Sequence, residues 1–117
     1  MAAHEDDLAY LWDMLQAARD AVEFVTGKRR AEWETDKMLR LAVERTVEIV
    51  GEAARHVSDR TRVEHAEIPW RQIVGLRHLL AHEYGQIDYE RLFDTVSYDI
   101  PELIKNLVAL LPPDAAP

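Results

Sequence analysis

A short segment of the sequence, residues 77–84, concentrates side chains that could cleave a phosphodiester bond. Arg77 is a permanent cation whose planar guanidinium suits a phosphate group. His78 and His82 carry imidazoles, which can take up or release a proton near neutral pH. Tyr84 adds a phenol two residues later. These residue types predict chemistry in which an imidazole moves protons while a guanidinium stabilises charge growing on phosphoryl oxygens.

The segment is expected to lie near the end of a helix, where spacing decides which side chains share a face. At about 100° per residue, His78 and His82 lie on one face of an α-helix, whereas Arg77 and His82 diverge by about 140°. Arg77 and Tyr84, seven residues apart, align if the helix continues that far. Convergence of Arg77 with His82 therefore requires the last helical turn to loosen before Gly85.

Three interpretations of these residues are open from the residues alone. Arg77 and His82 could flank an RNA phosphate, with His82 as a general acid or base. His78 and His82 could instead share a metal ion, although a zinc site would need further histidine or carboxylate ligands from elsewhere in the chain. In the third interpretation these cations cap a helix end, and the Tyr84 ring packs with its hydroxyl at the surface.

The hydrophobic pattern predicts an all-α fold in which four helices position these residues. Apolar residues recur at spacings of three and four in four segments: residues 5–26, 35–57, 69–84 and 88–111. Thr35 and Asp88 are the expected N-caps of the second and fourth helices, and Pro101 is expected to kink or split the last helix. In up-down order, these helices predict an antiparallel four-helix bundle.

Glycine, proline and polar residues mark the expected connections between the helices. Gly27 could end the first helix in a left-handed conformation, before a basic loop at residues 28–30. The polar stretch 58–67 indicates a second connection, and Pro69 suits the first position of the third helix. Gly51 lies within the second helix, where its cost of about 1 kcal/mol relative to alanine would be offset by a close helix crossing.

Length and composition limit the class of protein. The 117 residues are expected to form one domain, with a disordered tail at residues 112–117. The absence of cysteine excludes disulfides and thiolate chemistry, and the apolar run at 107–111 is far too short to span a bilayer. Because the acidic N-terminus argues against a signal peptide, we expect a cytoplasmic protein that does not bind a membrane.

The overall charge has the wrong sign for general nucleic-acid binding. The formal net charge is −8, so any attraction for RNA must come from a local cluster of cations. Residues 55–82 hold five arginines against three acidic residues, and residues 28–30 form a second basic cluster. A local basic site on an acidic body is one interpretation of this pattern. Solvated helix faces are the other.

Residues 68–84 resemble the signature of HepT-like proteins of the HEPN superfamily, reading IPWRQIVGLRHLLAHEY. The pattern of that family is an arginine, a polar residue, three further residues, a histidine, one residue and a tyrosine. Residues 51–54, 94–96 and 99–103 are also similar to segments of the second and final helices of the family. The resemblance covers nearly the whole chain.

The resemblance implies the ribonuclease toxin of a type VII toxin–antitoxin system, which cleaves RNA without a metal or cofactor. Arg77 and His82 would be catalytic, and His78 would support them at a position where the family commonly has asparagine. A helical domain that forms a two-fold homodimer would bring two such sites near one cleft. The antitoxin would be an MntA-like nucleotidyltransferase, which neutralises the toxin by transferring AMP to Tyr84.

A second interpretation keeps the dimer and Tyr84 but removes the catalysis. The chain would then be a non-catalytic helical partner that docks on a nucleotidyltransferase as its regulatory or substrate subunit. Toxicity that survives the loss of both Arg77 and His82 would favour this interpretation.

Overall fold

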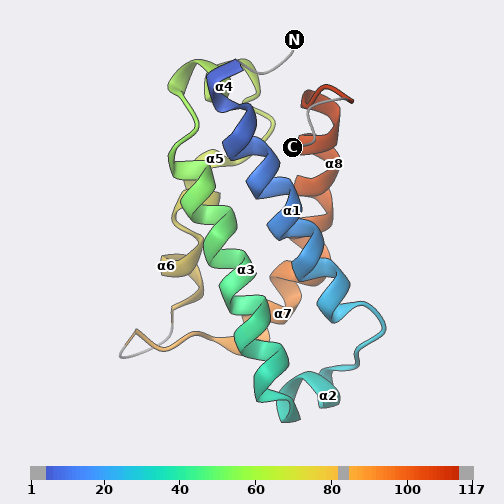
Figure 1. Ribbon diagram of the computed structural model, residues 1–117. Coiled ribbons are helices and arrows are strands. Elements are labelled where there is room, and N and C mark those ends of the chain that lie inside the picture. Colours follow the sequence, from blue (N-terminus) through green and yellow to red (C-terminus); the bar gives the residue numbers. More distant parts are fainter. Residues whose placement is uncertain (1–4, 82–84, 114–117) are drawn as a thin grey trace.

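The computed structural model describes residues 5–81 and 85–113, which are predominantly helical (Figure 1). The all-α class is therefore confirmed, whereas the antiparallel up-down arrangement of four helices remains a prediction. Within the described residues, no helix is long and apolar enough to cross a membrane. In chain order the elements are η1 (Glu5–Asp7), α1 (Leu8–Val25), α2 (Arg30–Thr35), α3 (Lys37–Arg55), α4 (Asp59–Glu64), α5 (Trp70–Val74), α6 (Leu76–Leu80), α7 (Tyr89–Asp94), η3 (Thr95–Asp99) and α8 (Ile100–Leu110).

The core lies where α1 packs against α3 on one side and α8 on the other (Figure 1). Each helix directs an apolar stripe at its neighbour, and Leu11 of α1, Val50 of α3 and Leu107 of α8 are completely buried. Gly27 has a φ of +77°, the left-handed conformation that was predicted for the end of the first helix. The predicted tail continues to residues 114–117, which lie outside the described residues.

The second helix begins later than predicted. Asp36 caps α3 in place of Thr35, because the Asp36 carboxylate accepts a hydrogen bond from the Leu39 amide at 3.0 Å. The preceding residues, predicted as a basic loop, include the short helix α2. Arg30 of that helix pairs with Asp94 of α7 at 2.6 Å. Part of the basic cluster therefore serves to join two elements of the fold.

A further helix, α4, occupies the stretch 58–67 that was predicted to be a plain connection. The Ser58 hydroxyl oxygen accepts a bond from the Thr61 amide and caps the helix. The buried Asp7 carboxylate accepts bonds from the Ser58 amide at 2.9 Å, the Ser58 hydroxyl at 2.6 Å and the Thr61 hydroxyl at 2.5 Å. These bonds fix α4 to the start of the described chain.

The third helix is broken and shorter than predicted. Gly75 separates α5 from α6, and α6 ends at Leu80 rather than near Gly85. Ala81 is already extended and forms an isolated antiparallel bridge with Ile87. Ala81 therefore does not continue α6, so the helical spacing assumed for the motif stops at Leu80.

Three other local features confirm the sequence-based expectations. A Cβ on Gly51 would lie 3.2 Å from the Ile73 carbonyl oxygen, so α3 and α5 cross closely at this glycine. The Asp88 carboxylate accepts a bond from the Arg91 amide at 3.1 Å and caps α7. Pro101 lies in the first turn of α8, directly after the π-helical turn η3, so the regular α-helical pattern of the last predicted helix is interrupted just before this proline.

Candidate functional site

Arg77 lies on α6, where this short helix packs against α3. Its side chain is 63% exposed, and its Nη1 donates a hydrogen bond to Glu48 Oε1 at 2.7 Å. The other oxygen of that carboxylate lies 3.5 Å from Nη1 of Arg45, one turn earlier on α3. One carboxylate thus contacts two guanidinium groups, and together the three side chains form a surface site with one net positive charge.

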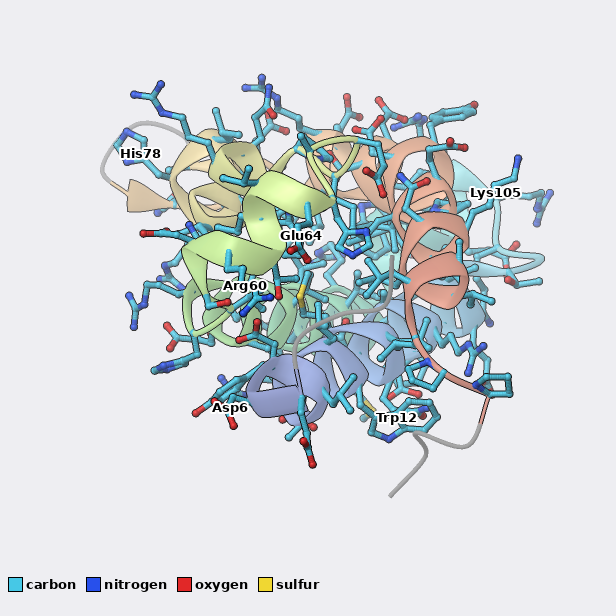
Figure 2. All side chains as sticks on the ribbon, turned by 90° about the horizontal axis from the view of Figure 1, so that it is seen from above. Asp6, Trp12, Arg60, Glu64, His78 and Lys105 are labelled. Carbon is cyan, nitrogen blue, oxygen red and sulfur yellow. The ribbon has the colours of Figure 1, made fainter. Side chains whose placement is uncertain are left out.

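The other predicted site residues are placed only in part. His78 is exposed at the edge of the molecule (Figure 2). His82 and Tyr84 lie outside the described residues, so the convergence of Arg77 and His82 remains a prediction. Because α6 ends at Leu80, helical spacing no longer supports a shared face for His78 and His82. In the part of the chain that the structure describes, no group of three or more histidine, cysteine, aspartate or glutamate side chains could hold a metal ion.

Beyond the motif, the chain contacts α3 again at Tyr89. The chain enters α7 at Tyr89, whose hydroxyl donates a hydrogen bond to Glu44 Oε1 at 2.7 Å. This bond raises the pKa of Tyr89, and partial burial acts in the same direction. The Arg40 guanidinium lies over the Tyr89 ring, 5.3 Å from its centroid. Two carboxylates of α3 therefore contact Arg77, the first residue of the motif, and Tyr89, which follows the motif.

Sequence reasoning did not identify Glu44, Glu48 or Tyr89. The two acids are four residues apart, so they lie on one side of α3, next to its buried stripe. An acidic pair at this spacing is a weak signal, because most such pairs are solvated. Only the packing of α6 and α7 on α3 shows which groups the two carboxylates meet.

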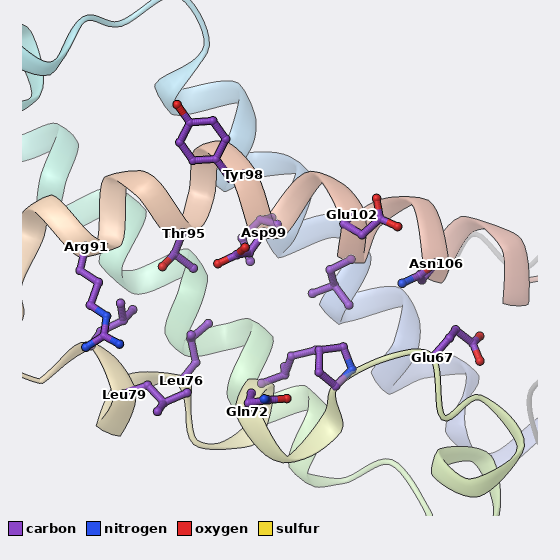
Figure 3. A pocket seen from close by; sticks show the side chains of 15 residues that line it. Glu67, Gln72, Leu76, Leu79, Arg91, Thr95, Tyr98, Asp99, Glu102 and Asn106 are labelled. Atoms are coloured by element: carbon purple, nitrogen blue, oxygen red, sulfur yellow. The ribbon is translucent and has the colours of Figure 1, made fainter.

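A separate groove of about 820 Å³ lies between α5–α6 and η3–α8 (Figure 3). Its apolar lining includes Ile73, Leu76 and Leu103. Its charged lining residues are Glu67, Arg91, Asp99 and Glu102. Three carboxylates against one guanidinium are unfavourable for an RNA phosphate. Arg77 does not line this groove and instead borders a small hollow shared with Glu44 and Glu48.

Comparison with known proteins places the chain in a family. The profile of the family described as "Ribonuclease HepT-like" matches residues 14–110, which extend from α1 to the end of α8. The chain belongs to the HepT-like ribonuclease family. The matched region contains Arg77, His78, His82 and Tyr84, so the motif lies inside the part of the chain that defines the family.

Several relatives in this family match over most of their length. A Methanocaldococcus jannaschii protein named as a candidate RNase, MJ1380, is 39% identical over 102 residues, covering 87% of this chain and 94% of the relative. A candidate RNase of Caldanaerobacter subterraneus is 34% identical, with coverage of 87% and 91%. A candidate ribonuclease HepT of Thermococcus cleftensis is 36% identical, with coverage of 86% and 89%. No solved structure matches the chain.

Proposed function

We propose that this chain is a metal-independent endoribonuclease and the toxin of a type VII toxin–antitoxin system. The observation that carries the proposal is the HepT-like family match, which includes the whole Arg77–His82–Tyr84 motif. The exposure of Arg77 supports it, because Glu48 is the partner of one nitrogen and a guanidinium has five N–H donors. The remaining donors suit the non-bridging oxygens of a phosphate.

In the proposed reaction, an RNA 2′-hydroxyl attacks the adjacent phosphorus and the bond to the 5′-oxygen of the next nucleotide breaks. The products are a 2′,3′-cyclic phosphate and a 5′-hydroxyl. His82 moves a proton, either from the 2′-hydroxyl or to the leaving oxygen. Arg77 stabilises the charge that grows on the phosphoryl oxygens, and His78 hydrogen-bonds nearby. The proposal includes a cytoplasmic homodimer of antiparallel four-helix domains with two such sites near one cleft.

Cleavage of RNA in the presence of EDTA tests this proposal. We expect the wild type to release products with cyclic phosphate ends, and Arg77→Ala and His82→Ala to lower the rate by about a hundredfold. Arg60→Ala is the matched control, because Arg60 is similarly exposed and pairs with Glu64 on α4. Intact RNA with the wild type, or cleavage by His82→Ala at the wild-type rate, would contradict the proposal.

We also propose that an MntA-like nucleotidyltransferase inactivates the toxin at Tyr84. The phenolic oxygen would attack the α-phosphorus of ATP and release pyrophosphate. The added anion, two residues from His82, would repel an RNA phosphate and block access to it. Mass spectrometry after co-expression should find AMP on Tyr84. Tyr84→Phe should carry no AMP and should stay toxic beside the antitoxin, and its full neutralisation would argue against this role.

The non-catalytic partner remains the alternative, and charge favours it. The net charge of −8 repels RNA, and Arg77 is already paired with Glu48. This alternative predicts AMP on Tyr84 but no cleavage by the unmodified protein. Growth arrest by a variant that lacks both Arg77 and His82 would support it.

A further inference from the structure

Two carboxylates on α3 contact the two ends of residues 77–89, the motif segment, which begins with the motif at residues 77–84. Glu48 accepts a hydrogen bond from Arg77 on α6, at the start of this segment, at 2.7 Å. Glu44, one turn earlier on α3, accepts a hydrogen bond from the Tyr89 hydroxyl on α7, at its end, also at 2.7 Å. These contacts join residues that are 29 and 45 positions apart in the chain. One helix therefore holds both ends of the motif segment.

Further bonds fix the same two ends. The Asp88 amide donates to the Leu80 carbonyl at 2.8 Å, which links the end of α6 directly to the start of α7. The completely buried Trp33 donates from Nε1 to the Tyr89 carbonyl at 2.8 Å. The Tyr89 backbone is thus held independently of its hydroxyl. The bond to Glu44 adds a restraint on the side chain rather than serving as its only support.

We propose that Glu44 and Glu48 are positioning residues that hold the motif segment on α3 and fix one edge of the Arg77 guanidinium. This inference rests on the proposed ribonuclease function, because Arg77 is taken as the group that meets the substrate phosphate. A guanidinium that is already ordered loses little side-chain entropy when the transition state forms, so kcat is higher. The same carboxylate cancels part of the positive charge of Arg77, so RNA binding weakens. Glu48 therefore acts in opposite directions on turnover and on binding.

The kinetic constants of Glu48→Ala test whether Glu48 raises kcat while it weakens RNA binding. We expect kcat to fall by about ten- to a hundredfold, because the guanidinium loses its fixed edge. KM for RNA should fall by about fivefold, because a negative charge that repels the RNA phosphate is removed. Glu48→Gln, which keeps a carbonyl acceptor, should show the lower KM with a smaller loss of kcat.

Glu64→Ala is the matched control for this experiment. Glu64 is 25% exposed against 26% for Glu48, and it pairs with Arg60 on α4 instead of with the motif (Figure 2). If Glu48 only stabilised the fold, its loss would lower the melting temperature without lowering KM. The same kcat and KM for Glu48→Ala and Glu64→Ala would overturn the inference.

A second measurement does not depend on cleavage. Glu44→Ala and Tyr89→Phe each remove one side of the same bond, and we expect each to speed hydrogen exchange at the Asp88 amide by about tenfold. Glu44→Ala should also lower the pKa of Tyr89 toward its ordinary value. If the wild type fails to cleave RNA, the proposed function is wrong. If exchange at Asp88 and the pKa of Tyr89 stay unchanged, the inference about Glu44 is wrong, whatever the activity.

Discussion

Among single residues, the buried carboxylate of Asp7 illustrates how strongly one side chain can join distant parts of this chain. It is 3% exposed and accepts three hydrogen bonds from Ser58 and Thr61. Replacing it removes this acceptor from the hydroxyl of the buried Thr61, and hydrogen bonds to a charged group are among the stronger ones. This part of the fold should therefore be sensitive to a single substitution.

We expect Asp7→Ala to lower the free energy of unfolding by about 3 kcal/mol. Asp7→Asn keeps one carbonyl acceptor and should lose less. Urea denaturation measures both. Asp13→Ala is the control, because Asp13 is exposed on α1 and its loss should change stability by no more than about 0.5 kcal/mol. Equal urea midpoints for Asp7→Ala and Asp13→Ala would show that the buried carboxylate contributes little.

Residue type alone could identify Arg77 but not the group that holds it. A guanidinium beside two histidines and a tyrosine is visible in the sequence, and the family resemblance is carried by the same residues. Glu48 is 29 positions away, and nothing in its own neighbourhood marks it as a partner. Its role follows only from the packing of α6 on α3. Long-range pairs of this kind need tertiary structure.

Among the helices, ends were predictable where the local chemistry of one residue decides them. Gly27 takes a left-handed conformation, Asp88 caps α7, and Pro101 lies in the first turn of α8, all as expected. The end of α6 was not predictable, because apolar spacing continues past Leu80. There the chain leaves the helix and pairs with Ile87 and Asp88, just before α7, and this contact outweighs local helix propensity.

The crossing of α3 and α5 gives a prediction about Gly51. Alanine favours a helix by about 1 kcal/mol over glycine, so Gly51→Ala would stabilise an isolated α3. Here the new Cβ would lie 3.2 Å from the Ile73 carbonyl oxygen and 3.7 Å from that of Val74, which are backbone atoms that cannot rotate away. We expect a net loss of about 1–2 kcal/mol and a larger loss for Gly51→Val.

Thermal melts of the Gly51 variants measure this effect. Met38→Ala is a suitable reference, because Met38 lies on the same helix and is 80% exposed. A higher melting temperature for Gly51→Ala than for the wild type would mean that α5 shifts to accommodate the methyl group. The close crossing would then be adaptable rather than rigid.

For the whole molecule, the distribution of charge limits where RNA could bind. The chain carries −8 overall, and the groove between α5–α6 and η3–α8 has mainly acidic charged residues in its described lining. Arg77 borders a different, small hollow, which it shares with Glu44 and Glu48. The composition predicted that any basic site would be confined to a small part of the surface. It could not predict the groove, because the lining residues are spread over positions 67–106 and meet only in the folded chain.

The π-helical turn η3 has a consequence for the length of the chain. The Ile100 amide bonds to the Thr95 carbonyl five residues back, so this turn holds one residue more than an α-helical turn. Deleting a residue here would leave a regular helix but rotate everything beyond it by about 100°. Leu103 and Leu107 would then swing out of the interior toward water. Insertions and deletions in this stretch should be harder to accommodate during divergence than exchanges of one side chain for another.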